Sequence, residues 1–289
     1  MAEERLAFDR NRPEIVGVLN VTPDSFSDGG RFVTTTRGAG VDVAGVLAAA
    51  KESIVGGATL LDVGGESTRP GAVSVSCEEE LARTLPAVEA LVEATSTPVS
   101  IDTRKAAVAD AALEAGATVV NDVSGGHADA DLLRVTAAHG AWLVLGHLRG
   151  TPETMQDAPH YEAVLEEVAD ELAASMALAL AAGVARDRIV IDPGIGFGKR
   201  LEDNLSLIVG VRRLGEVLDR PIMLGPSRKA FLGTLTGDPP EARDTATHAA
   251  CAIAAFLGVE ALRVHDPAGA SRAARVGVAL GQAAREDAA

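Results

Sequence analysis

Residues 14–20, EIVGVLN, form a short apolar run that ends in a polar residue, Asn20. Similar runs recur further along the chain, at 59–65, 98–103, 118–124, 142–147, 189–194, 221–227 and 261–266. Nearly continuous hydrophobicity over so few residues is typical of parallel strands that are covered on both faces. Amphipathic stretches rich in Ala, Glu, Arg and Leu lie between the runs, so predicted strands alternate with predicted helices.

Eight strand–helix units within 289 residues favour a (β/α)8 TIM barrel, an α/β fold built as a single domain. An open doubly wound sheet is the main alternative, and it should carry a Gly-rich turn directly after its first strand. No G-x-G-x-x-G follows 14–20, and GIGFGK at 194–199 matches neither the dinucleotide nor the P-loop spacing. We expect the barrel to span 14–281, between an N-terminal tail at 1–13 and a C-terminal tail at 282–289.

The bulk composition narrows the class of protein. A net charge of −15 argues against a nucleic-acid partner, because phosphate backbones need clustered Lys and Arg. No apolar run approaches the length of a membrane span, and the charged N-terminus lacks an apolar signal core. Cys77 and Cys251 lie far apart, which fits neither a disulfide framework nor a zinc pattern. We expect a cytoplasmic protein with small-molecule partners and no nucleic-acid or membrane partner.

Polar side chains stand at the end of nearly every predicted strand. They are Asn20, Glu66, Arg69, Asp102, Asn121, Asp122, His147, Asp192, Ser227, Arg228, Lys229, Arg263 and His265. A single polar residue at a strand end is more often a cap or a turn former. The carboxyl ends of all strands in a barrel face one common site, so the whole set predicts a binding or active site.

One group of these residues is suited to a flat, nitrogen-rich ring. Asp102, Asn121 and Asp192 end apolar runs, so burial should force them to pair with donors. An aminopyrimidine face offers several N–H donors and would satisfy two carboxylates and an amide together. The alternative for Asp102 is helix N-capping, because 102–103 precede a predicted helix.

A second group, Asn20, Arg69, Arg263 and His265, is suited to a phosphate or diphosphate. Surface ion pairing is the alternative for any arginine. Arg263 and His265 alternate with Val264, however, so both point the same way from one strand. The Gly-rich segments 64–72 and 225–233 allow close approach to an anion or a ring.

Seven motifs together resemble the dihydropteroate synthase family, in order and over about residues 14 to 280. They are GVLNVTPDSFSDGG, DVGGESTRPGA, SIDT, NDVSGG, DPGIGFGK, GPSRKAFLG and RVHD. The resemblance implies a TIM barrel that condenses 6-hydroxymethyl-7,8-dihydropterin diphosphate with p-aminobenzoate. The products would be 7,8-dihydropteroate and diphosphate, in folate biosynthesis, with sulfonamides as competitors and a homodimer as the assembly.

The resemblance also implies a role for individual residues. A pterin pocket would be lined by Asp102, Asn121, Asp192, Phe197, Gly225 and Lys229. The diphosphate would be held by Asn20, Arg69, Arg263 and His265, with Asn20 also binding Mg2+. The p-aminobenzoate would lie among Phe26, Thr68, Pro70 and Ser227. Catalytic roles would belong to Asp28, Arg69 and Lys229, and the segment after Asn20 would act as a lid.

Three positions depart from the family pattern. Gly146 stands where Met is usual, which we expect to loosen pterin binding or to leave room for another side chain. Arg149 replaces a frequent Gln, and Pro267 replaces a usual Val. Two alternatives therefore stay open: a catalytically silent pterin-binding paralogue and a pterin-dependent methyltransferase, although the latter has no need of Phe26 or STRPGA.

Overall fold

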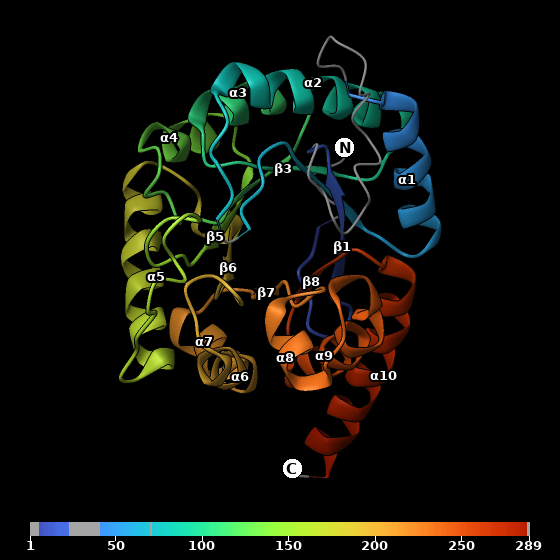
Figure 1. The fold of residues 1–289 in the computed structure, drawn as a ribbon, viewed down its shortest axis with the longest axis vertical. Helices are drawn as coiled ribbons and strands as arrows, with labels where there is room; N and C mark the ends of the chain where they lie inside the picture. The colour runs from blue at the N-terminus through green and yellow to red at the C-terminus, as the bar shows by residue number, and fades with distance from the viewer. Residues whose placement is uncertain (1–5, 23–40, 70, 288–289) are drawn as a thin grey trace.

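The computed structural model describes residues 6–22, 41–69 and 71–287. Phe26, Asp28 and Pro70, three of the expected site residues, therefore lie outside the described residues. Within them, parallel strands form a ring that helices surround (Figure 1). The strands are β1 (Glu14–Asn20), β2 (Leu60–Gly64), β3 (Val99–Asp102), β4 (Val119–Asp122), β5 (Trp142–Gly146), β6 (Ile189–Asp192), β7 (Met223–Leu224) and β8 (Ala261–Val264).

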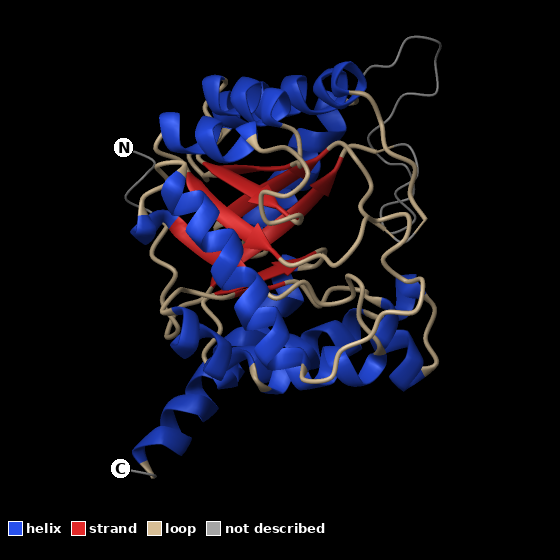
Figure 2. Ribbon diagram, turned by 90° about the vertical axis from the view of Figure 1, so that its left-hand side faces the viewer, coloured by secondary structure: helices blue, strands red, loops and turns tan. Residues whose placement is uncertain are grey.

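The strand order β6-β5-β4-β3-β2-β1-β8-β7 is that of a barrel rather than of a doubly wound sheet. A parallel bridge between Ile191 and Ile222 joins the two outer strands of that order, and the Ile191 amide donates to the Pro221 carbonyl at 2.9 Å. The predicted (β/α)8 barrel is therefore confirmed, and each apolar run contains one of its strands. Figure 2 shows the strands enclosed by helices.

The helices that follow the strands cover the outside of the ring. They are α1 (Val43–Val55), α2 (Cys77–Ala94), α3 (Ala106–Glu114), α4 (Asp131–Ala138), α5 (Val164–Ala181), α6 (Leu201–Val209), α7 (Val211–Leu218), α8 (Ala230–Thr236), α9 (Asp244–Leu257) and α10 (Pro267–Glu286), with short 3-10 turns η2 (Arg186–Arg188) and η3 (Pro240–Ala242). No helix in the described ranges is both long enough and apolar enough to cross a membrane.

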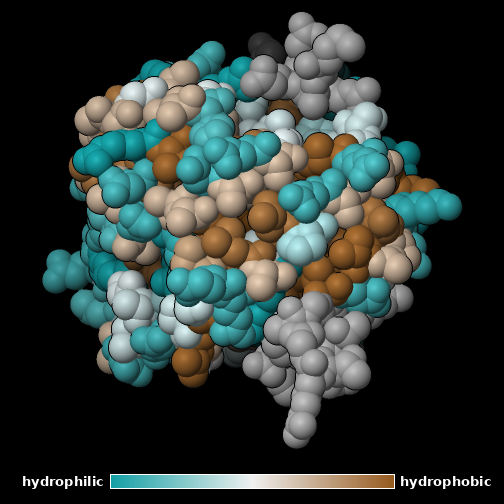
Figure 3. Space-filling model, turned by 90° about the horizontal axis from the view of Figure 1, so that it is seen from above, coloured by the Kyte–Doolittle hydropathy of each residue, from teal (hydrophilic) through white to brown (hydrophobic). Residues whose placement is uncertain are grey.

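Helix α2 illustrates how the outer layer forms. Its N-cap, Ser76, accepts a hydrogen bond from the Glu79 amide at 3.2 Å, which satisfies one free amide of the first turn. One face of the helix buries Ala87, Val88 and Leu91 against the barrel, whereas the opposite face exposes glutamates. In the view from above, hydrophilic and apolar residues are interspersed over this side of the molecule (Figure 3).

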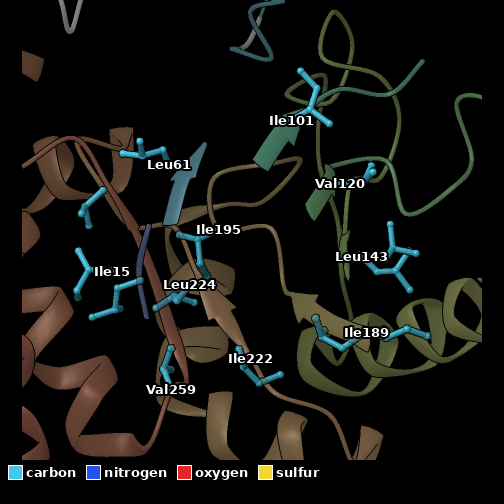
Figure 4. Close-up of a cluster of buried hydrophobic side chains, with 14 of the residues drawn as sticks. Ile15, Leu61, Ile101, Val120, Leu143, Ile189, Ile195, Ile222, Leu224 and Val259 are labelled. Atoms are coloured by element: carbon cyan, nitrogen blue, oxygen red, sulfur yellow. The ribbon is translucent and has the colours of Figure 1, made fainter. Parts of the chain in front are cut away.

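Alternation along the strands creates two apolar layers. Residues such as Ile15, Leu61 and Leu143 point outward and pack beneath the helices (Figure 4). Their neighbours point inward and fill one end of the barrel, as a cluster of Leu6, Phe8, Val16, Leu60, Val119, Val144, Val190, Met223 and Ala261. Because this inner cluster closes one end, the space inside the other end is left for polar residues.

The ends of the domain differ from the expected boundaries. Leu6 and Phe8 belong to the inner cluster, and the Phe8 ring lies 4.8 Å from the Trp142 ring, centroid to centroid. The described part of the expected N-terminal tail thus closes the barrel floor, because two large apolar side chains gain burial there. At the other end, α10 continues to Glu286, into the expected C-terminal tail at 282–289.

Candidate active site

The strand alternation also explains how polar residues come to share the open end of the barrel. Asn121, Asp192 and Arg263 each lie two positions after a residue of the inner apolar cluster, so they point inward as well. A cavity of about 650 Å³ opens at this end. Of the expected residues, its lining includes Asn20, Thr68, Arg69, Asp102, Phe197, Ser227, Lys229, Arg263 and His265.

Three expected pterin residues stand outside the cavity lining: Asn121, Asp192 and Gly225. Asn121 and Asp192 are nevertheless tied to residues that do line it. Asn121 donates from Nδ2 to the same Asp62 oxygen that binds Arg263, and Asp192 interacts electrostatically with Lys229 and Arg263. The two side chains therefore form a polar layer directly behind the cavity.

Arg263 lies at the centre of that layer. Its Nε donates to Asp62 Oδ2 at 2.6 Å, and its Nη2 donates to Asp102 Oδ2 at 2.7 Å. The residue expected to hold diphosphate therefore binds two buried carboxylates, which links the diphosphate group of residues to the pterin group. Asp62 was missed in the sequence, although an aspartate at an inward position of an otherwise apolar run was the available signal.

Asp102 is not a helix cap. The N-cap of α3 is Lys105, and Asp102 pairs with Arg263 instead. Burial raises the pKa of Asp102 to about 7, since it disfavours the charged form, while the Arg263 guanidinium opposes the rise. Asp102 therefore lies at the cavity with one carboxyl oxygen, Oδ2, bound to Arg263.

Asp192, behind the cavity, and Lys229, in its lining, are opposite charges that interact electrostatically. Asp192 Oδ1 accepts from the Gly194 amide at 2.8 Å, and burial raises the pKa of this carboxyl while Lys229 opposes the rise. Burial lowers the pKa of Lys229 to about 8, with Asp192 opposing. The Lys229 ammonium stands 3.9 Å from the centroid of the Phe197 ring. This arrangement fits a ligand-facing cation better than a solvated one.

Ser227 and His265 are joined directly. Ser227 Oγ lies 2.9 Å from His265 Nδ1 and accepts from the His265 amide at 3.1 Å. Burial, and then the cations Arg228 and Arg263, lower the pKa of His265 to about 3. The ring is therefore neutral at physiological pH. In the tautomer with its proton on Nε2, the ring accepts from the Ser227 hydroxyl at Nδ1 and can donate to an anion from Nε2.

Glu66 organises the loop after β2. Its Oε1 accepts from Ser74 Oγ at 2.8 Å and from the Val75 amide at 2.9 Å, and its Oε2 accepts from Arg104 Nη2 at 2.8 Å. Burial alone would raise the pKa of Glu66, but these hydrogen bonds and the Arg104 charge lower it to about 2. The carboxylate thereby fastens the far end of the loop that carries Thr68 and Arg69 into the cavity.

Gly146 does not leave an empty space. A Cβ atom placed there would lie 2.5 Å from Val123 Cα and 2.9 Å from the Asp122 carbonyl oxygen. The expectation of room for another side chain is wrong, because the backbone after β4 occupies it. Arg149 turns toward α5, where its Nη2 lies 3.0 Å from Glu167 Oε2 and also pairs with Glu171.

Pro267 begins α10 as its first residue. The N-cap Asp266 accepts there from the amides of Ala268 and Gly269, at 3.1 and 3.2 Å. Proline suits this position because its missing N–H would have no partner within the helix. Proline at position 267 is therefore explained by its place in the first turn of α10.

Lys199 is a further site residue that the sequence analysis missed. It lines the cavity, and its ammonium lies 2.9 Å from His147 Nδ1 and 2.9 Å from the Phe197 carbonyl oxygen. The feature that could have indicated it is the lysine that ends GIGFGK, shortly after the predicted strand 189–194 that carries Asp192.

The described residues do not contain a group of three or more His, Cys, Asp or Glu side chains arranged to hold a metal ion. Asn20 does line the cavity, as do Arg69 and His265. Mg2+ commonly keeps several waters and takes oxygens from substrate phosphates, so one protein oxygen fits a metal that arrives with a diphosphate.

The chain is similar to proteins of one known family over most of its length. The sequence profile of a family described as pterin binding enzyme matches residues 16–265. A dihydropteroate synthase from Synechocystis is 42% identical over 272 residues, which cover 93% of this chain and 90% of the relative.

Two solved structures are also similar. A Yersinia pestis dihydropteroate synthase in a sulfonamide drug complex has a TM-score of 0.87 and 37% identity, covering 96% of each chain. A Xanthomonas albilineans dihydropteroate synthase with 4-aminobenzoic acid has a TM-score of 0.82 and 42% identity, covering 96% of this chain and 94% of the other. The chain therefore belongs to the dihydropteroate synthase family of pterin-binding enzymes.

Proposed function

We propose that this chain is a transferase of folate biosynthesis that joins 6-hydroxymethyl-7,8-dihydropterin diphosphate to p-aminobenzoate and releases diphosphate. The observation that carries the proposal is one cavity whose lining combines the carboxyl of Asp102 with the cations Arg69, Lys229 and Arg263. A substrate with N–H donors at one end and a diphosphate at the other matches that division of charge.

The pterin ring would take the inner part of the cavity. Its N–H donors would meet Asp102 and Asp192, and Asn121 would add an amide behind them. Burial raises the pKa of both carboxyls, so each gains from a donor that satisfies its ionised form. Phe197 and Lys229, already in contact, would flank the ring.

Loss of diphosphate leaves a cationic methylene on the pterin, and two features of the site favour that step. Arg69 and the neutral His265 ring would bind the departing oxygens, with Asn20 holding Mg2+ beside them. When bound, Mg2+ neutralises negative charge on the leaving group. The carboxylates of Asp102 and Asp192 would favour the positive charge that develops on the ring.

The arylamine would approach from the outer part of the cavity, where Thr68 and Ser227 line the wall. The Xanthomonas relative was solved with 4-aminobenzoic acid, which supports this choice of acceptor. A reactive pterin cation must be kept from water, so the segment after Asn20, which carries Phe26 and Asp28, would act as a lid, and Pro70 of the second loop would contribute to the acceptor site. Sulfonamides would compete there, as the sulfonamide complex of the Yersinia relative suggests.

The direct test mixes purified protein, Mg2+, the pterin diphosphate and p-aminobenzoate, and measures 7,8-dihydropteroate by mass spectrometry. The proposal predicts product together with diphosphate, and chelation of Mg2+ should slow the reaction sharply. Pterin binding without product would instead support the silent paralogue, and methyl transfer from a methylated pterin to a corrinoid would support the methyltransferase.

We propose further that the protein works in the cytoplasm as a homodimer assembled through the C-terminal helices. In support, α9 and α10 expose Ile253, Phe256, Val276 and Leu280, which are 40 to 59% accessible. Large exposed apolar side chains grouped on two packed helices are suited to a protein interface. Light scattering on a sizing column tests this, since a mass near 29.5 kDa would correspond to a single chain.

A further inference from the structure

Lys199 is a buried cation for which the proposed reaction so far has no role. The residue is 4% exposed and lies on the segment between β6 and α6. Its hydrogen-bond acceptors are His147 Nδ1 at 2.9 Å, the Phe197 carbonyl at 2.9 Å and the His147 carbonyl at 3.5 Å. All three acceptors are neutral when the His147 ring is neutral. A buried ammonium is costly unless a negative charge compensates it, so Lys199 needs a carboxylate nearby.

His147 is held as a neutral acceptor for Lys199. Burial, and then the Lys199 charge, lower the pKa of His147 to about 4. Its Nε2 lies 2.9 Å from Glu171 Oε2, so the ring donates to that carboxylate and accepts from Lys199 at Nδ1. Arg149, which replaces a frequent Gln of the family, pairs with Glu171 from the other side. The chain of contacts from Arg149 through Glu171 and His147 fixes Lys199 at the cavity.

The carboxylate with the strongest electrostatic effect on Lys199 is Asp192. Asp192 Oδ1 accepts from the Gly194 amide at 2.8 Å, and a Cβ placed on Gly194 would lie 3.4 Å from the Lys199 ammonium. Both groups therefore adjoin the same glycine. Burial lowers the pKa of Lys199 to about 7, and Asp192 is the main group that opposes this fall. Conversely, Lys199 is one of the cations that oppose the burial-raised pKa of Asp192.

The charged groups around this pair come from several elements. Asp192 is faced by Lys229 at the start of α8, by Arg263 of β8 and by Lys199. Lys199 is faced by Asp192, Lys229, Glu171 of α5 and Arg149 of the loop after β5, and it acts in turn on His147 and on Asp203 of α6. Arg263 also binds Asp62 and Asp102, and Lys229 also acts on Asp102. Lys199 instead makes its hydrogen bonds at the Asp192 side of the cavity.

We propose that Lys199 is a positioning residue of the pterin site, which fastens the segment after β6 to the end of β5 and keeps Asp192 ionised. The inference rests on the proposed function, since it assumes that Asp192 accepts the N–H donors of a pterin. It assigns Lys199 no contact with the reacting atoms. Its effect reaches substrate through the charge of Asp192 and the placement of Phe197.

The test measures pterin binding without turnover. The dissociation constant of pterin-6-carboxylate is followed by fluorescence from pH 5 to 9, for the unaltered protein, Lys199→Met and Lys199→Arg. Loss of the cation should raise the pKa of Asp192. As the pH is lowered, Lys199→Met should therefore lose pterin binding at a higher pH than the unaltered protein does. We expect binding about tenfold weaker at pH 6 and nearly unchanged at pH 9, with Lys199→Arg close to the unaltered protein. Lys51→Met, which removes an exposed lysine from α1, is the matched control and should change nothing.

Each outcome is decisive. The inference is supported if Lys199→Met shifts the low-pH part of the binding curve in the unaltered protein but not in a protein that also carries Asp192→Asn. Equal weakening at every pH would show that Lys199 only fastens the segment and has no effect on the charge of Asp192, and an unchanged profile would show no role; both overturn the inference. Should Lys199→Met fail to fold by circular dichroism, Lys199→Gln carries the same comparison. Absence of pterin binding by the unaltered protein at all pH values would contradict the proposed function and this inference with it.

Discussion

The guanidinium of Arg263 and the carboxylate of Asp62, 201 residues apart in the chain, meet at 2.6 Å inside the barrel. Asp62 is about 1% exposed at its side chain, and the same oxygen also accepts from Asn121 at 3.0 Å. Because Arg263 also binds Asp102, this half-buried arginine joins β8 to β2 and β3, and Asn121 links β4 to the group through Asp62. The polar layer of the site is therefore also part of the core.

Asp62→Asn tests this dual role. Arg263 keeps its bond to Asp102 but loses the charged acceptor of its Nε, so we expect the free energy of unfolding to fall by about 1.5 to 3 kcal/mol. Urea denaturation followed by circular dichroism measures the change. Asp219→Asn is the control, because Asp219 pairs with Arg186 at an 80% exposed position and should cost well under about 1 kcal/mol. Equal effects of the two variants would contradict the structural role of Asp62.

Glu66→Gln should act on the acceptor side of the site. A glutamine cannot accept at once from Ser74, the Val75 amide and Arg104 as the carboxylate does. The loop with Thr68 and Arg69 should therefore loosen. We expect the KM for p-aminobenzoate to rise about tenfold while the KM for the pterin diphosphate changes less. Steady-state kinetics with each substrate varied gives the two values, and the exposed Glu79→Gln serves as the control. A larger change on the pterin side would argue against this role.

The lowered pKa of Glu66 also predicts that the stability of the fold depends on pH. Its folded pKa, about 2, lies below the ordinary value of 4.5, so the ionised form stabilises the fold. That contribution is fully present above about pH 4.5 and is lost as the pH falls toward 2. Glu66→Gln should therefore flatten the fall in stability over this range, as measured by thermal unfolding at a series of pH values. A parallel curve for the variant would contradict the assignment.

His265→Ala should weaken handling of the diphosphate. We expect kcat/KM for the pterin diphosphate to fall about tenfold to a hundredfold, as for loss of one preorganised donor. The ring is neutral in the folded protein well below pH 6, so the factor should be the same at pH 6 and pH 8. A larger effect at pH 6 would indicate a cationic His265 and contradict this account. His139→Ala, at the end of α4, is the remote control.

Gly146→Met restores the residue that is usual in the family, yet we expect it to harm this protein. Its Cβ would collide with the backbone at Val123, so the strand ends must separate at a cost of about 1 to 3 kcal/mol. Pterin affinity should fall as well, because β4 and β5 carry Asn121 and the His147 segment. Leu148→Met, a volume-conserving change at a half-buried neighbour, is the control. Tighter pterin binding by Gly146→Met would show that the cavity does have the missing space.

Much of the fold was accessible from sequence because it depends on a local pattern. Short apolar runs can be read directly, and a barrel requires their polar ends to converge, which brings Asp102, Lys229 and Arg263 together. The side chains with which these residues pair could not be predicted from the local pattern. Arg263 could have faced solvent or an anion, and its pairing with Asp62 depends on the register of strands that are distant in the chain.

The same limit applies to Lys199 and Gly146. A lysine after a glycine-rich turn is ordinarily solvated, and only the packing of β5, β6 and α5 encloses it beside His147. The space beside Gly146 is set by the backbone that follows β4, which composition and periodicity do not reveal. Tertiary contacts, rather than local propensity, decide both positions.

The central claim is that one cavity, at the carboxyl ends of the strands, holds both substrates. A crystal structure of the protein with a pterin and 4-aminobenzoate tests it most directly. The account predicts the pterin N–H donors on Asp102 and Asp192, with the aminobenzoate beside Thr68 and Ser227. Ligand in the separate cavity lined by Arg10 and Glu260, or a pterin away from both aspartates, would contradict it.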